Sequence, residues 1–185
     1  DVMTLKTILF SDLERQYRAN GQDEKSASYI GLILGAFSPR FMPVVLFRLS
    51  HWFYMHKLSP IAKLFSLFNF MLFGLEIAVR CKIGKGLYFP HTQGTVIGAS
   101  SIGENATIYH NVTFGAREVD LGYQESSRPT VGDNVIVGAG AKVLGGIFIG
   151  ANVHIGANSV VLEDVKDFMT VGGVPAKIIR QRSPA

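Results

Sequence analysis

The N-terminal part of the chain carries apolar residues at helical spacing. Between residues 4 and 19 they recur at steps of three and four, at Leu5, Ile8, Leu9, Leu13 and Tyr17. This spacing predicts an amphipathic helix. Apolar stretches of the same kind continue over residues 29–72, with breaks near Pro39, Pro43 and Pro60. We therefore expect residues 1–72 to form an N-terminal helical region.

The spacing changes to six residues in the second part of the chain. Aliphatic or aromatic residues recur there in two series: Ile77, Ile83, Phe89, Val96, Ile102, Ile108 and Phe114, and then Val131, Val137, Val143, Ile149, Ile155 and Val161. One extra residue precedes Val96 in the first series, and the second series is regular. Glycine follows many of these positions, at residues 84, 103, 115, 132, 138, 150 and 156.

A six-residue period fits a solenoid whose coils each hold three short strands with a corner after every strand. The apolar residues then point inward and stack into one column. Asparagines supply the tight backbone at the corners, at Asn105, Asn134, Asn152 and Asn158. A β-sandwich would instead show alternation in twos. The expected organisation is a mainly β protein, with helices over 1–72, a solenoid over 73–166 and a tail over 167–185.

The segment 115–130 interrupts the six-residue period between the two series. Its sequence, GAREVDLGYQESSRPT, is polar and contains two glycines. Long loops inserted into a regular repeat commonly shape a binding site. We expect this segment to be an excursion that contributes to the function.

Composition narrows the class of protein. The 185 residues carry a net charge of +4 and a sequence pI near 9.3, which favours anionic partners. The basic residues form no nucleic-acid motif, so nucleic acid is not expected as a partner. The single cysteine, Cys81, reads as a buried structural thiol. The first residues show no secretory signal, which makes the cytoplasm the expected location.

Residues 41–79 are strongly apolar but are interrupted by charged and helix-breaking residues such as Arg48, Lys57, Pro60 and Lys63. No uninterrupted apolar span of about 20 residues remains, so a membrane-spanning helix is not expected. Lys57 and Lys63 next to an apolar stretch leave open a peripheral contact with the inner face of the membrane.

Five short runs have a specific order and spacing: LFRLSHWFY (46–54), KIGKGLYFPHTQGTVIG (82–98), VGAGAKVLGG (137–146), IGANSVVLEDV (155–165) and VGGVPAKIIR (171–180). Over about residues 41–180 the chain resembles the serine O-acetyltransferase branch of the hexapeptide-repeat acyltransferases. The resemblance implies a left-handed parallel β-helix, a homotrimer, and an active site between neighbouring subunits.

The resemblance also implies a catalytic pair. The family base is a histidine in a run like PHTQG, which here is His91. Attack of a hydroxyl on a thioester needs a base that removes the proton as the bond forms, and a neutral imidazole is suited to this. Glu76 stands fifteen residues earlier, where the family has an acidic residue that orients the base.

Acetyl-CoA is the co-substrate that the resemblance implies, and no metal is expected. The pantetheine arm is expected to lie along small residues of the coils, namely Gly138, Ala139, Gly156 and Ala157. Lys177 resembles the basic tail that the family places near the nucleotide phosphates.

Two positions depart from the serine enzymes. Arg128 stands where they have a second histidine that helps to hold the acceptor, and Pro90 stands where they have an aspartate before the base. The shorter pattern is more similar to relatives that acetylate sugars. We therefore expect a sugar of a surface polysaccharide or its precursor as the acceptor, with Arg128 in contact with it, and serine as the alternative.

Two other classes of function remain as alternatives. His91 and His110 are nineteen residues apart and could stack on one face, as in zinc-dependent hydratases of the γ-carbonic-anhydrase kind. Such a site needs three protein ligands, and His154 lies at a different phase of its repeat. A non-catalytic scaffold is the second alternative, and the PHTQG run argues against it.

Overall fold

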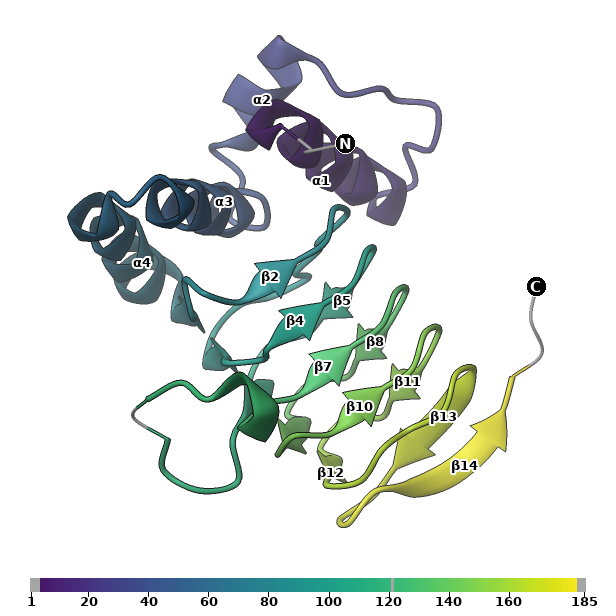
Figure 1. The fold of residues 1–185 in the computed structure, drawn as a ribbon. Coiled ribbons are helices and arrows are strands. Elements are labelled where there is room, and N and C mark those ends of the chain that lie inside the picture. The colour runs from purple at the N-terminus through teal and green to yellow at the C-terminus, as the bar shows by residue number, and fades with distance from the viewer. Residues whose placement is uncertain (1–3, 121, 183–185) are drawn as a thin grey trace.

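Four helices form the first part of the chain in the computed structural model, which describes residues 4–120 and 122–182 (Figure 1). They are α1 (Leu5–Ala19), α2 (Tyr29–Gly35), α3 (Met42–Met55) and α4 (Ser59–Phe73). Thr4 caps α1, because its Oγ1 accepts a hydrogen bond from the Thr7 N–H. Pro43 and Pro60 lie in the first turns of α3 and α4, where the missing N–H costs no helix bond. The N-terminal helical region is confirmed.

The rest of the chain winds through three sheets, in which the strands pair in parallel except for β13 and β14. The first sheet has the order β1-β3-β6-β9-β12, the second β10-β7-β4-β2, and the third β14-β13-β11-β8-β5. From β3 to β11 successive strands step from the first sheet to the second and then to the third, so each of these turns adds one strand to every sheet (Figure 1). The strands are β1 (Leu75–Ile77), β2 (Lys82–Ile83), β3 (Thr95–Ile97), β4 (Ser101–Ile102), β5 (Thr107–Ile108), β6 (Thr113–Gly115), β7 (Thr130–Val131), β8 (Ile136–Val137), β9 (Lys142–Leu144), β10 (Phe148–Ile149), β11 (His154–Ile155), β12 (Val160–Val161), β13 (Met169–Gly172) and β14 (Lys177–Gln181).

The core is the predicted apolar column, with one correction. All but one of the residues of the six-residue series are buried. Val96 is 38% exposed, and its neighbour Ile97 points inward instead. The inward position before Ile97 is taken by Thr95, which is fully buried and donates its hydroxyl proton to the Tyr109 carbonyl. Ile97 pairs in register with Ile77 and Phe114, and it lies eight residues after Phe89 and five before Ile102. The irregular spacing at this coil therefore hid the inward residue of the series.

The corners between sheets use the residues that the sequence indicates. Asn105, Asn134, Asn152 and Asn158 all adopt positive φ, near 57°. Gly103 is needed for another reason: a Cβ there would lie 2.7 Å from the backbone carbon of Gly132 in the next coil. The coils therefore stack backbone on backbone at this corner, which is why it admits no side chain.

A buried ion pair fastens the helical region to the first coils. Arg48 on α3 donates through Nε to Asp12 on α1 at 2.8 Å, and the two side chains are 4% and 0% exposed. Arg48 also donates to the carbonyls of Ile83 and Gly84, both at 2.6 Å. Asp12 in turn accepts from the Leu87 N–H at 2.9 Å. Every strong polar group in this contact has a partner, as a buried pair requires.

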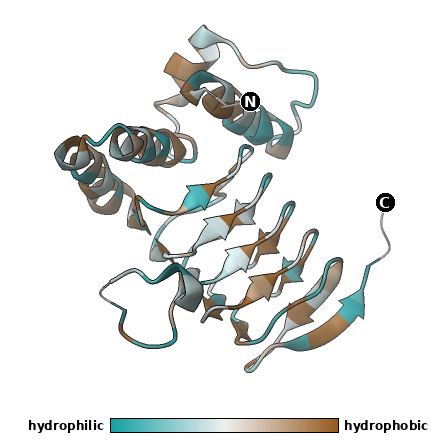
Figure 2. Cartoon of the chain, viewed as in Figure 1, coloured by the Kyte–Doolittle hydropathy of each residue, from teal (hydrophilic) through white to brown (hydrophobic). Residues whose placement is uncertain are grey.

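The helices α3 and α4 are rich in apolar residues, as the brown parts of their ribbons show (Figure 2), and several of these side chains are exposed. Leu64, Leu67 and Met71 on α4 are 49%, 50% and 68% exposed. Within residues 4–120 and 122–182, no helix combines the length and the apolarity that a membrane crossing requires. Peripheral contact of this face with a membrane stays a prediction.

Candidate active site

One corner of the solenoid, between the third and the first sheet, gathers most of the predicted site residues. It consists of residues 91–94, 109–111, 138–140 and 156–158, and we call it the histidine corner. Backbone hydrogen bonds stack its turns: Asn111 N–H donates to Gln93, Gly140 N–H to His110, and Asn158 N–H to Ala139, at 2.8 to 3.0 Å. Groups that are far apart in the sequence therefore lie in one line along the solenoid axis.

His91 and His110 lie on consecutive turns of this corner. Their ring centroids are 5.6 Å apart and the rings meet edge to face, at 83°. Both side chains are exposed to solvent. The expected stacking of the two histidines on one face is confirmed, and the His91 ring is free to receive a hydroxyl from solvent.

His154 does not join them. It lies on β11, and its Nε2 accepts from Arg182 Nη1. Among the residues that the structure describes, no group of three or more His, Cys, Asp or Glu side chains could hold a metal ion.

Glu76 lies on β1 and pairs in register with Val96 on the neighbouring strand β3 of the first sheet. Its side chain is exposed and points outward from the first sheet. The chain enters this sheet directly after the histidine corner. Within the described part of the chain, no hydrogen bond or ion pair joins Glu76 to His91. The orienting contact between the two side chains stays a prediction.

The four small residues predicted to contact the cofactor continue the histidine corner. Gly138 and Ala139 follow β8, and Gly156 and Ala157 follow β11. A Cβ on Gly138 would lie 2.6 Å from the Ala157 nitrogen, so the stacking of the coils already requires glycine there. At Gly156 the nearest atom would be 3.3 Å away, which is a milder constraint. Below His110 the corner therefore forms a ridge of glycine and alanine residues, at 138–140 and 156–157.

Lys177 lies at the far end of the same ridge. It begins β14 and pairs with Gly172 of β13, whose strand adjoins β11. Lys177 also lines a recess of about 540 Å³ at the end of the solenoid, together with Pro175 and Ala176. Four strand spacings separate β5 from β14, or roughly 19 Å. An extended ligand would need that length to span from His110 to Lys177.

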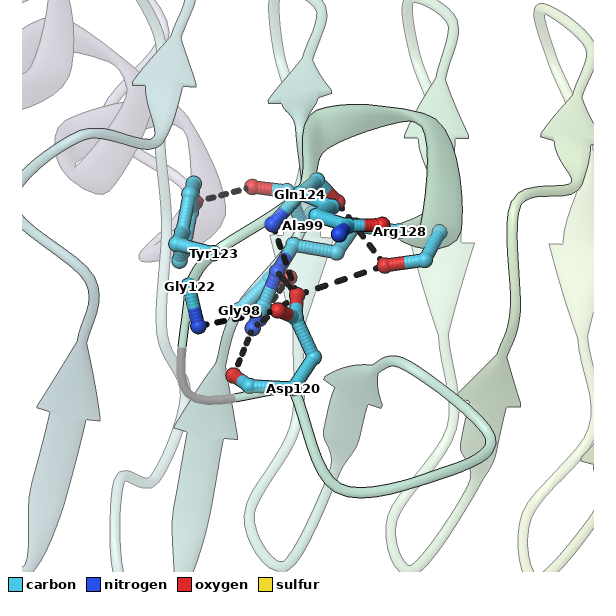
Figure 3. A network of polar contacts seen from close by, with 8 residues as sticks. Gly98, Ala99, Asp120, Gly122, Tyr123, Gln124 and Arg128 are labelled. Atoms are coloured by element: carbon cyan, nitrogen blue, oxygen red, sulfur yellow. Dashed lines mark hydrogen bonds and ion pairs between the residues drawn. The ribbon is translucent and has the colours of Figure 1, made fainter.

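Arg128 is held inside the excursion loop, as Figure 3 shows. Its Nε and Nη2 both donate to the Asp120 carboxylate, at 3.1 and 2.9 Å. Nη2 also donates to the Asp120 carbonyl, and Nη1 to the Gly98 carbonyl. The guanidinium lies 4.0 Å from the ring of Tyr123, whose hydroxyl donates to Ala99. Four of the five guanidinium protons are therefore engaged within this chain, and the predicted contact of Arg128 with an acceptor stays a prediction.

This network was not foreseen from the sequence. The network joins the excursion loop to Gly98 and Ala99 of the solenoid. The loop begins after β6 and returns through a short helical turn at Glu125–Ser127. The loop shapes a cavity of about 730 Å³ against Gly145, Gly146 and Ile147. The sequence shows only that an aspartate stands eight residues before an arginine in a polar loop. This spacing does not predict an ion pair, because a loop without a repeat fixes no distance between the two side chains.

The pKa of Asp120 is lowered. Partial desolvation acts to raise it, and the hydrogen bonds from the Gln124 N–H and from Arg128, with the charge of Arg128, outweigh that effect. A lowered pKa means that the carboxylate stabilises the loop above its ordinary pKa of 3.8, and that this contribution is lost as the pH falls through the folded-state value.

We expect Arg128→Gln to raise the pKa of Asp120 back toward 3.8, because the variant loses the positive charge and its hydrogen bonds. Titration of the Asp120 carboxyl carbon by NMR measures this directly. Trypsin should also cut the Arg128→Gln loop at Arg117 several-fold faster than the wild-type loop. Glu118→Gln, a change of an exposed acid in the same loop, is the matched control. An unchanged Asp120 titration in Arg128→Gln would contradict the pairing.

Known proteins share both the repeat and the whole architecture of this chain. Residues 128–163 match the family model described as "Bacterial transferase hexapeptide (six repeats)". A soybean serine acetyltransferase structure is 32% identical, with a TM-score of 0.78 over 95% of this chain and 69% of that one. The chain belongs to the hexapeptide-repeat acyltransferase family.

Other members of the family have the same fold. The structure of the Neisseria gonorrhoeae serine acetyltransferase is 30% identical, with a TM-score of 0.82 over 98% of this chain and 67% of that one. The likeness confirms the predicted left-handed parallel β-helix with N-terminal helices. It also identifies the histidine corner as part of a hexapeptide-repeat acyltransferase fold.

Two curated members are more similar in sequence. Serine acetyltransferase from Synechococcus elongatus is 45% identical over 143 residues, and that from Staphylococcus aureus 44% over 134 residues. The matches cover 76% and 72% of this chain, which spans 57% and 62% of those relatives' lengths. These names do not support the expected closer similarity to the sugar O-acetyltransferases, so that expectation is corrected.

Proposed function

We propose that this chain transfers the acetyl group of acetyl-CoA to the hydroxyl of serine, with His91 as the general base. The observation that carries the proposal is an exposed imidazole at the head of a ridge of small residues, in a chain 45% identical to a serine acetyltransferase. Serine replaces the sugar acceptor that the sequence favoured.

The chemistry requires little more than the base and its position. His91 takes the proton of the serine hydroxyl as the oxygen attacks the thioester carbon. The tetrahedral intermediate then collapses, the carbon–sulfur bond breaks, and CoA leaves as a thiolate that is stable enough to need no covalent enzyme intermediate. Glu76 acts through His91 as a positioning residue: a carboxylate on the neighbouring strand favours one ring orientation and stabilises the imidazolium.

Acetyl-CoA lies along the histidine corner in this proposal. The small residues Gly138, Ala139, Gly156 and Ala157 allow the pantetheine arm to approach the backbone, and Lys177 faces the phosphates at the far end. Solved serine acetyltransferases that resemble this chain include a complex with coenzyme A, from Brucella abortus. The Arg128-anchored loop leaves from the opposite edge of the first sheet, and the proposal places it beside His91 of a neighbouring subunit. A homotrimer is therefore part of the proposal.

A sugar acceptor is the second candidate, because Pro90 precedes the base and Arg128 replaces the second histidine of the serine enzymes. Release of free thiol from acetyl-CoA distinguishes the two. We expect release to depend on L-serine, with O-acetylserine found by mass spectrometry. Alanine, which lacks the hydroxyl, is the control acceptor. Release that depends on hexoses or their nucleotide-linked forms, with none on serine, would overturn the serine assignment and leave the acetyl transfer intact.

A further inference from the structure

A second recess lies away from the histidine corner, between the end of α1 and the outer face of the third sheet. Its volume is about 390 Å³, at the small end of the range for ligand pockets. It is lined by Arg15, Arg18, Asn105, Asn134, Ile136, Asn152, His154 and Arg182. Nothing in the proposed acetyl transfer uses these residues.

The recess is positively charged and contains no carboxylate. Arg15 and Arg18 enter it from α1, and Arg182 from the segment after β14. Acidic side chains on the adjoining turns are already engaged elsewhere. Glu104 pairs with Lys85 at 3.5 Å, and Asp133 accepts from the Glu104 N–H at 2.7 Å. Three guanidinium groups therefore face one small volume without a counter-charge in its lining.

Polar atoms in and beside the recess lack partners. Arg15 donates one proton, from Nη2 to the Thr107 hydroxyl at 3.1 Å, while its Nε is buried with no hydrogen-bond partner in the described structure. The hydroxyl of Thr170, next to His154 in register, is also buried and unpartnered. A buried guanidinium N–H without an acceptor is costly, and an anion would remove that cost.

His154 lies in the same recess, and its pKa is affected by the excess of positive charge there. Arginine can only donate, so His154 Nε2 accepts from Arg182, and the ring is neutral with its proton on Nδ1. Burial lowers the pKa of His154, and the charges of Arg182 and Arg180 lower it further. The charged groups around this ring are cationic: Arg15 and Arg18 of α1 line the same recess, and Arg182 and Arg180 act on the ring from the C-terminal side. Its other neighbours, Ile136 and Thr170 in register and Asn134 and Asn152 in the recess, are uncharged.

We propose that this recess binds a small phosphate-bearing molecule from solution, with the phosphate held between Arg15, Arg18 and Arg182. Guanidinium groups bind phosphate oxygens through paired N–H donors, and Arg15, Arg18 and Arg182 line the recess with three such groups. The asparagine side chains at positions 105, 134 and 152 offer further donors to the rest of the ligand. The assignment does not depend on the acetyl transfer.

The test uses the full chain and follows the His154 ring by NMR in inorganic phosphate, in pyrophosphate and in chloride at equal ionic strength. We expect phosphate and pyrophosphate to raise the pKa of His154 saturably, because a bound anion offsets the positive charge of the arginines that lowers it. The His154 resonance distinguishes this recess from any phosphate bound near Lys177. Equal shifts in phosphate and chloride would overturn the proposal.

The variant Arg18→Gln tests whether phosphate binds in this recess or responds only to the net charge of the protein. Arg18 is exposed, so its replacement leaves the fold intact, and we expect phosphate to bind at least tenfold more weakly. Arg40→Gln removes the same charge from an exposed position outside the recess and should bind like wild type. Equal affinities of the two variants would overturn the assignment. Binding only to vesicles of phosphatidylglycerol, with no effect of dissolved phosphate, would overturn it as well.

Discussion

Replacing His91 by alanine is expected to lower kcat for acetyl transfer by about 10²- to 10⁴-fold, the usual contribution of a positioned general base. The ring is exposed and makes no bond that the fold needs, so the variant should fold normally. Circular dichroism and light scattering check the fold and the assembly. KM for acetyl-CoA should change little, because the ridge that holds the cofactor is untouched.

Two further histidine variants sharpen this test. His56→Ala removes an exposed imidazole whose one bond is to the Trp52 carbonyl of its own helix, and it should retain full activity. His110→Ala removes the ring that meets His91 edge to face, and shows how far the pair acts together. Wild-type turnover by His91→Ala would remove this residue from the mechanism. Loss of activity in His110→Ala alone would reassign the base.

Replacing Arg48 by methionine is expected to lower the free energy of unfolding by about 3–5 kcal/mol. The change leaves Asp12 as an uncompensated carboxylate that is 0% exposed, and removes two bonds to the carbonyls of the first coil. Urea unfolding at one fixed protein concentration measures the loss. Arg40→Met, at an exposed position, should lie within about 0.5 kcal/mol of wild type.

The double variant Asp12→Leu, Arg48→Met separates the pair from its surroundings. Removing both charges avoids the isolated carboxylate, so it should be more stable than Arg48→Met alone. If the double variant is no more stable than the single one, the cost comes from the lost carbonyl and amide bonds at Ile83, Gly84 and Leu87 instead.

The sequence predicted the solenoid because its signal is local. An inward side chain every six residues follows from the geometry of one coil, and twelve of the thirteen positions in the two series are indeed buried. The exception at Val96 arises because the spacing is irregular at this coil: Ile97, which pairs in register with Ile77 and Phe114, lies eight residues after Phe89 and five before Ile102. The helices were predictable for the same local reason, while their attachment through Asp12 and Arg48 joins residues 36 positions apart.

The site was predictable only where it follows the repeat. His91 and His110 stack because they occupy equivalent places in consecutive coils. Arg128 could not be interpreted in this way, since its partners Asp120 and Tyr123 belong to a loop without a period. The basic recess could not be predicted either, because its lining residues come from α1, the third sheet and the segment after β14. These segments are far apart in the sequence and share no repeat.

The last strand, β14, runs antiparallel to β13, whereas every other strand pair in the solenoid is parallel. The edge strand of a sheet presents unpaired backbone N–H and C=O groups, with which a strand of another molecule could pair. β14 is this edge strand in the third sheet, and it carries the exposed side chains of Lys177 and Arg180. Charged side chains on an edge oppose pairing with a further strand, so β14 limits association through the third sheet at this end.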